Sequence, residues 1–165
     1  MTEQIPAART VTHSRTEQVH IVMPGDCNQY FRLFGGQLVQ WIDTVAAVVA
    51  RRHSGSAVTT ASIDRLDFLA SASLNDLVVL TGRILFVGRT SMQIAVDTFV
   101  EDMQCKQRRM VNRATLTLVA LGEDNRPAEV PRLTPETEEE TADFAKGKAL
   151  YEAKQAGRNC TVIAK

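Results

Sequence analysis

The carboxylate of Asp43 lies in a segment that is otherwise apolar and typical of a buried helix. The segment reads FGGQLVQWIDTVAAVVARR and begins at Phe34. Aspartate is a poor helix former, and its carboxylate is costly to bury without a partner. At the rim of a pocket, such a group could act as a general base. The free backbone N–H groups at the start of the same helix, at Gly35 and Gly36, could then face a developing oxyanion.

A helical projection places Asp43 at the edge of the buried face. Three lines of side chains follow the helix at about 100° per residue. The apolar line is Leu38, Ile42, Val45 and Val49, the polar line roughly opposite is Gln37, Gln40, Thr44 and Arg51, and Asp43 shares its line with Gly36, Val39, Ala47 and Ala50. Small neighbours leave room for a ligand. A structural interpretation is also open, in which Asp43 is a solvated edge residue or pairs with Arg65 or Arg89.

The elements that must position this helix are predicted from the periodicity of the chain. The helix is expected to run from Gly35 to about His53, with Gly55 as its stop and with Arg51, Arg52 and His53 as positive charges near its C-terminal end. Beyond it, apolar and polar residues alternate as in long β-strands. The turns at Asn75-Asp76 and Gly88-Arg89 predict antiparallel hairpins. The expected strands are 57–70, 76–88, 91–100 and 112–121, preceded by a short strand at 19–23.

A second, peripheral helix is expected near the C-terminus. Thr134 suits its N-cap, Pro135 its first position, and the acidic residues that follow complement the helix dipole. The chain then divides into a flexible N-terminal leader at 1–17, a main domain at 18–133, and a C-terminal helix and tail at 134–165. The fold class is α+β, with one long apolar helix, an antiparallel sheet and a peripheral helix.

The composition excludes several classes of protein. Lys plus Arg and Asp plus Glu both number 19, so the formal net charge is zero and no global field draws the chain to nucleic acid or to a membrane surface. The cysteines Cys27, Cys105 and Cys160 form no C-x-x-C pair, so neither a disulfide framework nor a metal site is expected. No segment reads as a signal peptide or a membrane span. A reduced, cytoplasmic setting fits these features.

Three segments together resemble a known enzyme family. They are VMPGDCN…LFGGQLVQWIDTVAAVVARRH, VTTASIDRLDF and VGRTSMQIAVD, and the similarity extends from about Val19 to Arg132. The family is that of the hotdog-fold acyl-CoA thioesterases, in the branch of the bacterial acyl-CoA hydrolases and the brain-type acyl-CoA hydrolase. The resemblance implies a long helix wrapped by an antiparallel sheet. It also implies a homo-oligomer with a dimer as the minimal unit, often a trimer of dimers, whose active sites form across the dimer interface.

The resemblance also implies roles for individual residues. Asp43 matches the catalytic carboxylate, Gly35 and Gly36 match the helix-start glycines, and Thr60 matches a threonine near the reacting centre. Arg89 is the first expected contact to a coenzyme A phosphate, because guanidinium suits bidentate recognition of phosphate. No metal and no separate cofactor is implied, since coenzyme A is part of the substrate. The full set of expected substrate or coenzyme A contacts is Asn28, Phe34, Gly88, Arg89, Thr90 and Ser91.

This sequence departs from the family pattern just before the helix. Relatives commonly have a small or amide residue after the asparagine that matches Asn28, and one branch carries a functional asparagine at the position of Arg32. These positions bear on the preference for the acyl chain. The residues that follow Asn28 here are Gln29, Tyr30 and Phe31.

The implied reaction is hydrolysis of an acyl-CoA to a free carboxylic acid and coenzyme A. Asp43 either deprotonates a water molecule or attacks directly to form an anhydride, and both routes stay open. Two other functions compete. An enoyl-thioester hydratase normally relies on a histidine paired with an acid, and none occurs between Pro24 and His53. A non-enzymatic acyl-CoA-binding sensor or assembly module has no need of a carboxylate beside an anionic ligand.

Overall fold

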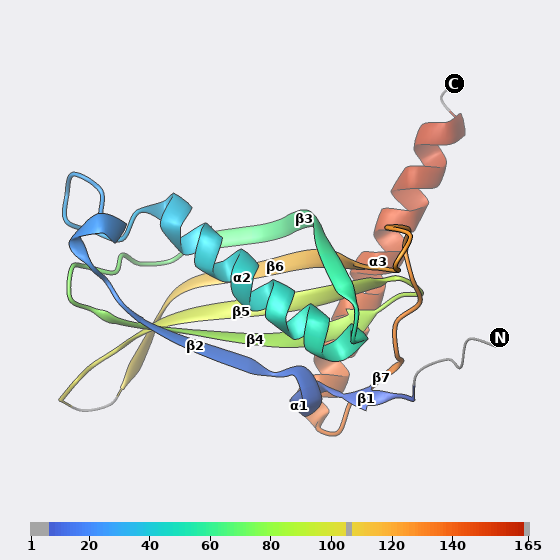
Figure 1. Ribbon diagram of the computed structural model, residues 1–165, viewed down its shortest axis with the longest axis horizontal. Helices are drawn as coiled ribbons and strands as arrows, with labels where there is room; N and C mark the ends of the chain where they lie inside the picture. Colours follow the sequence, from blue (N-terminus) through green and yellow to red (C-terminus); the bar gives the residue numbers. More distant parts are fainter. Residues whose placement is uncertain (1–6, 105–106, 164–165) are drawn as a thin grey trace.

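Figure 1 shows one long helix lying across an antiparallel sheet. The computed structural model describes residues 7–104 and 107–163. Among the helices described, none is long and apolar enough to cross a bilayer. The helices are α1 (Val11–Ser14), the short 3₁₀ helix η1 (Pro24–Asp26), α2 (Gly35–Ser54) and α3 (Glu138–Ile163). The strands are β1 (Arg9–Thr10), β2 (Thr16–Ile21), β3 (Ala57–Phe68), β4 (Leu77–Val87), β5 (Ser91–Glu101), β6 (Arg108–Leu121) and β7 (Leu133–Thr134).

The long helix α2 buries one apolar face and ends at a left-handed glycine. The backbone of Gly55 has a φ of 73°, and its amide donates to the carbonyl oxygen of Arg51 at 2.8 Å. Strand β4 approaches the helix closely at Gly82, where a Cβ atom would lie 2.6 Å from Cγ1 of Val45. The predicted helix, its stop and its buried face are confirmed, because the whole predicted apolar line is buried: Leu38, Ile42, Val45 and Val49.

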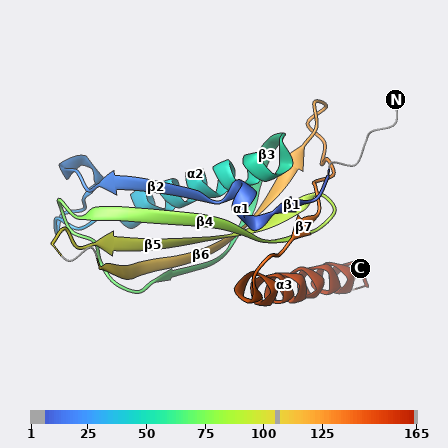
Figure 2. The same ribbon diagram turned by 90° about the horizontal axis from the view of Figure 1, so that it is seen from below.

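The main sheet has five strands in the order β2-β4-β5-β6-β3, and every neighbouring pair is antiparallel. Helix α2 covers one face of this sheet, and α3 lies against the opposite face (Figure 2). The four long strands that the alternation predicts are confirmed, and the arrangement is the α+β hotdog fold. Apolar side chains of the three central strands fill the core: Val78, Leu80, Ile84, Met92, Ile94, Val96, Leu116 and Leu118.

The turn at Asn75-Asp76 does not close a hairpin, contrary to the prediction. Strand β3 pairs with β6, whereas β4 lies between β2 and β5, so the chain crosses the sheet after β3. The hairpin predicted at Gly88 is confirmed, because β4 and β5 pair and the Gly88 amide donates to the Ser91 carbonyl oxygen at 2.8 Å. Within the described ranges, β3 is an edge strand, with β6 as its one strand partner.

Both ends of the chain differ from their predictions. Residues 9–17 are not a flexible leader, because β1 pairs in parallel with β7 and Val11 is only 2% exposed. Residues 1–6 of the predicted leader lie outside the described residues. Thr134 does not cap the peripheral helix, because it belongs to β7. Helix α3 begins at Glu138 instead, and the Thr137 hydroxyl accepts from the Glu140 amide at 3.1 Å, as an N-cap does.

Candidate active site

The carboxylate of Asp43 is bonded to Thr60 and reaches the protein surface. Asp43 comes from the half-buried shoulder of α2, and Thr60 comes from the exposed edge strand β3. The Thr60 hydroxyl donates a hydrogen bond to Oδ1 of Asp43 at 2.7 Å. No hydrogen bond from the described part of the chain reaches Oδ2, so this oxygen keeps its capacity to accept one. Two of the residues expected at the catalytic centre are thus in contact.

The ion pairs considered for Asp43 do not form within the described protomer. The Arg65 guanidinium pairs with the Asp67 carboxylate, and Arg89 pairs with Glu129. The interpretation of Asp43 as half of a structural ion pair with either arginine is therefore wrong.

An irregularity in β3 accompanies the position of Thr60. The pairing of β3 with β6 shifts register between Thr60 and Ser62, and again between Ile63 and Arg65. A bulge of this kind adds an unpaired residue and re-aims the side chains beside it. The segment around Thr60 contains no glycine or proline, so its sequence carries no local signal for the bulge.

The first turn of α2 presents free backbone amides beside an aromatic ring. Its first hydrogen bond runs from the Leu38 amide to the Phe34 carbonyl oxygen at 3.1 Å. The amides of Gly35 and Gly36 precede that bond and have no partner in the described residues, so they form the positive end of the helix dipole. No acid in the first turn neutralises it. The Phe34 ring lies over Gly36, where a Cβ atom would be 2.5 Å from a ring carbon.

Asp43 and the amide of Gly36 are separated along α2. They are about two helical turns apart, which places them roughly 10 Å from one another along the axis. In acyl transfer, the reacting carbon must lie about 3 Å from both the nucleophile and the oxyanion donors. The helix of one protomer therefore does not place its Asp43 carboxylate in direct contact with a carbonyl carbon held at its own Gly36.

The loop before α2 holds the side chain of Asn28 in a defined orientation. Its Oδ1 accepts hydrogen bonds from the amides of Tyr30 at 2.9 Å and Arg32 at 3.3 Å. Because the carbonyl end is held by the loop, Nδ2 is the end left to donate. Phe31, at the tip, has a left-handed backbone with a φ of 56°. Asn28 and Gly35 line one groove, so this predicted contact residue does lie beside the helix start.

That groove has a volume of about 330 Å³. Two apolar side chains at its wall are largely open to solvent, Phe68 at 55% and Leu69 at 58% exposure. The sequence did not lead us to predict this wall, although the adjacent apolar residues Phe68 and Leu69 at the end of a strand were a signal for it. The complete lining is Asn28, Arg32, Leu33, Gly35, Leu38, Phe68, Leu69, Ala70 and Ser71.

The hairpin from Gly88 to Ser91 makes no contact with Asp43 in the described protomer. It joins β4 to β5 at the same end of the sheet as the C-terminus of α2 (Figure 1). A Cβ atom on Gly88 would lie 2.7 Å from the Tyr151 ring, so the glycine lets α3 pack closely here. The Arg89 side chain is 75% exposed, and its Nη1 lies 3.5 Å from Oε1 of Glu129. The Thr90 carbonyl oxygen accepts from the amide of a neighbouring strand.

Two histidines, His20 beside α2 and His53 within it, serve packing. The His20 ring stacks on Trp41, with centroids 4.1 Å apart, and burial lowers the pKa of His20 despite the opposing effect of Asp26. His53 is fully buried, with Nε2 2.9 Å from the carbonyl oxygen of Pro131. Burial lowers the pKa of His53 as well. His53 therefore does not supply the positive charge expected at the end of α2.

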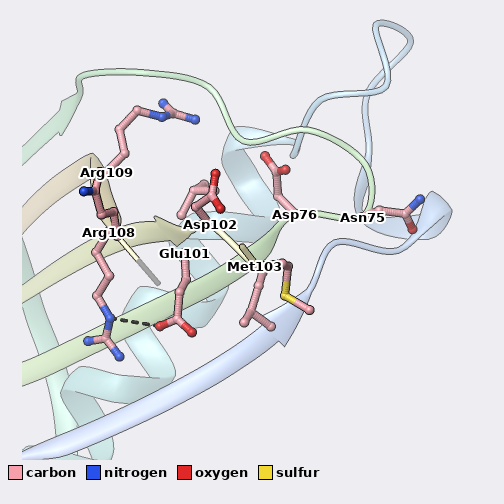
Figure 3. Close-up of a pocket in the computed structure, with 10 residues that line it drawn as sticks. Asn75, Asp76, Glu101, Asp102, Met103, Arg108 and Arg109 are labelled. Atoms are coloured by element: carbon pink, nitrogen blue, oxygen red, sulfur yellow. Dashed lines mark hydrogen bonds and ion pairs between the residues drawn. The ribbon is translucent and has the colours of Figure 1, made fainter. Parts of the chain in front are cut away.

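A larger cavity, of about 460 Å³, lies between the β5–β6 hairpin and the turn before β4. Figure 3 shows Asp76, Glu101 and Asp102 around it, with Arg108 directed toward Glu101. Arg108 forms ion pairs with Glu101 at 3.1 Å and with Glu17 at 3.2 Å, so its charge is neutralised. None of the predicted site residues lines this cavity, and its acids disfavour an anionic ligand.

Comparison with known proteins relates this geometry to a family. The sequence profile of the thioesterase superfamily matches residues 32–106. An uncharacterized acyl-CoA thioester hydrolase of Bacillus subtilis is 36% identical over 137 residues, which are 83% of this chain and 80% of that protein. The chain belongs to the thioesterase superfamily. This superfamily member is also 34% identical over 157 residues to the rat cytosolic acyl coenzyme A thioester hydrolase, of which the chain spans 41%.

Solved structures of other thioesterases share the fold of this superfamily member. An apo-hexameric acyl-CoA thioesterase has a TM-score of 0.87 at 36% identity, covering 93% of this chain and 98% of that one. An acyl-CoA hydrolase from Staphylococcus aureus, in complex with butyryl coenzyme A and coenzyme A, has a TM-score of 0.86 at 28% identity, covering 96% and 99%. Alanine variants of that hydrolase at Asn28, Asp43 and Thr60 have also been solved. The present chain has the same three residue types at the same three numbers.

Proposed function

We propose that this protein is an acyl-CoA thioesterase, which hydrolyses an acyl-CoA to a carboxylic acid and coenzyme A. The observation that carries the proposal is the carboxylate of Asp43, bonded to Thr60 through one oxygen and open at the other. Similarity to acyl-CoA thioester hydrolases supports the substrate class. A cytoplasmic location is part of the proposal, supported by the lack of paired cysteine motifs and by the description of the rat relative as cytosolic.

In this mechanism Asp43 supplies either a base or a nucleophile. As a base, Oδ2 accepts a proton from a water molecule while the water oxygen attacks the thioester carbonyl carbon. The oxyanion that forms accepts a hydrogen bond from the amide of Gly36. The carbon–sulfur bond then breaks, and the coenzyme A thiolate takes up the proton. In the nucleophilic route the carboxylate forms an anhydride that water opens, with the same products.

Water is the co-reactant in both routes, and coenzyme A enters as part of the substrate. The proposed reaction therefore requires no metal and no separate cofactor. Arg89, together with Gly88, Thr90 and Ser91, is proposed to hold the nucleotide end of coenzyme A. The exposure of the Arg89 guanidinium and its long contact to Glu129 support this role, because the guanidinium can turn toward a phosphate.

The proposed catalytic unit is a homodimer. Because one helix separates its Gly36 amide from its own Asp43 by roughly 10 Å, the carbonyl held at Gly36 is attacked from Asp43 of the partner subunit. The open edge of β3, which carries Thr60 and the exposed Ile63, is the surface proposed to pair with its twin. A trimer of such dimers is the proposed full assembly, in line with the hexameric relative.

Thiol release from acyl-CoA tests the function. Purified protein is incubated with acyl-CoAs of increasing length and a thiol reagent, and kcat/KM is determined for each. We expect steady release by the wild-type protein and a loss of about 10²–10⁴-fold in Asp43→Asn, the range for a positioned base. Thermal stability should stay the same or rise. Saturable binding without thiol release would instead identify a non-enzymatic acyl-CoA sensor.

A further inference from the structure

The guanidinium of Arg32 is a cation in the groove beside α2 with no acid to neutralise it. The hydrogen bonds of Arg32 involve its backbone, because its amide donates to Oδ1 of Asn28 and its carbonyl oxygen accepts from the Asn28 amide at 2.8 Å. No carboxylate of the described chain forms an ion pair with the side chain. Among the arginines in the strands of the main sheet, Arg65, Arg83, Arg108 and Arg113 are paired with acids.

The groove around Arg32 favours an anionic ligand. None of the residues that line it is acidic. A second guanidinium lies at its rim, because Nη2 of Arg109 donates to the carbonyl oxygen of Ser71 at 3.3 Å, and Ser71 is part of the wall. The free amides at the start of α2 add a positive partial charge. Three sources of positive potential therefore meet an apolar surface here.

The position of the groove indicates which part of the substrate carries the anion. The groove includes Gly35, next to the Gly36 amide that is proposed to bind the thioester carbonyl oxygen, and its walls include the apolar side chains of Leu38, Phe68 and Leu69. Its volume of about 330 Å³ suits a short acyl chain. The phosphates of coenzyme A are separated from the thioester sulfur by the whole pantetheine arm. An anion within this groove therefore belongs to the acyl group.

We propose that Arg32 binds a carboxylate at the far end of the acyl group, so that coenzyme A monothioesters of short dicarboxylic acids are the preferred substrates. This inference rests on the proposed thioesterase function and names its substrate class. A guanidinium and a carboxylate pair through two parallel hydrogen bonds, which select both charge and position. Arg32 is a specificity-determining residue and does not touch the reacting atoms.

The test compares a carboxylated acyl group with a neutral one of the same length, on two carriers. Thiol release is measured with glutaryl-CoA and pentanoyl-CoA, and with the corresponding pantetheine thioesters, which carry no phosphate. The variants are Arg32→Gln and, as a matched control, Arg126→Gln. Arg126 lies in an exposed turn, paired with Asp124. Because the loop is held by backbone atoms of Arg32, the glutamine variant keeps the groove intact.

We expect the wild-type protein to prefer both glutaryl thioesters. Arg32→Gln should lower kcat/KM for both glutaryl thioesters by about 10- to 100-fold, the range for a lost hydrogen-bonded charge pair, and leave both pentanoyl thioesters within about twofold. Arg126→Gln should change none of the four. Equal losses on both CoA thioesters, with no loss on the pantetheine thioesters, would show that Arg32 binds a coenzyme A phosphate and would overturn the proposal. An unchanged preference in Arg32→Gln would also overturn it.

Binding separates this inference from the proposed function. Calorimetric titration with glutaryl-CoA and pentanoyl-CoA is carried out on Asp43→Asn, with and without Arg32→Gln. If no thioester is hydrolysed by the wild-type protein, the thioesterase proposal fails. In that case, tighter binding of glutaryl-CoA than of pentanoyl-CoA, with the difference removed by Arg32→Gln, still supports the anion site. Equal binding of the two ligands rejects it.

Discussion

The hydroxyl of Thr60 on strand β3 donates a hydrogen bond of 2.7 Å to the Asp43 carboxylate on helix α2, from a position 17 residues away in the chain. This bond fixes one carboxylate oxygen and leaves the other without a hydrogen-bond partner in the described residues. A side chain with free rotamers would lose much of its efficiency as a base, because catalysis depends on a narrow range of approach geometries. The proposed function of the site depends on this contact.

Replacement of Thr60 should therefore reduce turnover without removing it. We expect Thr60→Ala to lower kcat by roughly tenfold or more, because the carboxylate loses its orienting donor. Thr60→Ser, which keeps the hydroxyl, should recover most of the activity. The measurement is kcat and KM for one acyl-CoA, with urea unfolding as a control for stability. A serine variant as impaired as the alanine variant would show that the methyl group, and not the hydrogen bond, is what matters.

Mixed dimers should recover activity if the site spans two protomers. Asp43→Asn removes the base, and Gly36→Pro removes the amide hydrogen of the proposed oxyanion donor. Each variant alone should be nearly inactive. Co-expression of the two variants with different affinity tags gives hybrid dimers. One of their two sites then combines the intact Gly36 of the Asp43→Asn protomer with the intact Asp43 of the Gly36→Pro protomer. We expect such hybrids to regain a substantial fraction of wild-type turnover, measured after tandem purification. Hybrids as inactive as their parents would contradict a site that combines Gly36 of one protomer with Asp43 of the other.

Phe31 should be a source of backbone strain. Its φ of 56° is costly for a residue with a side chain, and its ring is 69% exposed, so it gains little from packing. Phe31→Gly should stabilise the fold by about 1 kcal/mol, since relief of strain exceeds the added entropy of the unfolded chain. Tyr30→Gly is the control, because Tyr30 is equally exposed and lies outside the left-handed region. Urea unfolding should show the opposite sign for the two variants.

The attachment of α3 to the sheet should weaken in acid. Lys154 on α3 donates to Oδ1 of Asp64 on β3 at 2.5 Å. Burial acts to raise the pKa of Asp64, but the hydrogen bonds from Lys154, Ser62 and Thr117 outweigh it, so the pKa lies below the ordinary value of 3.8. A folded-state pKa below the unfolded one contributes stability that is present above the unfolded pKa and is lost as the pH falls through the folded pKa.

Removal of the lysine tests this linkage. In Lys154→Met, we expect a lower free energy of unfolding at about pH 7. Between about pH 4 and pH 2, this variant should lose less stability than the wild-type protein does, because without Lys154 the fold favours the charged form of Asp64 less strongly. Urea unfolding across that range gives both quantities. Lys148→Met is the matched control, since Lys148 is paired with Glu152 on its own helix, at 4.0 Å. An acid-side slope unchanged by Lys154→Met would contradict the assignment.

The elements that could be predicted from sequence are those set by local rules. The 3.6-residue period and the glycine at its end marked α2, and the two-residue alternation marked the four long strands. These signals are local because backbone hydrogen bonds in a helix, and side-chain alternation in a strand, depend on neighbouring residues. The peripheral helix was predicted too early, at Thr134, because that residue pairs with Thr10 from the opposite end of the chain. Its capping preference was outweighed by this long-range contact.

Sequence by itself determined the types of groups in the site and the spacing of Gly36 and Asp43 on one helix. The tertiary structure decided which groups meet. The bulge in β3 accompanies the contact of the Thr60 hydroxyl with Asp43. The two arginines that were candidate partners of Asp43 pair with Asp67 and Glu129 instead. The end of β3 forms a wall of the groove that contains the unpaired Arg32. Apart from the Arg65–Asp67 pair, which lies within β3, these contacts join residues from different elements. Strand order and register create such contacts, and no local pattern of residues encodes them.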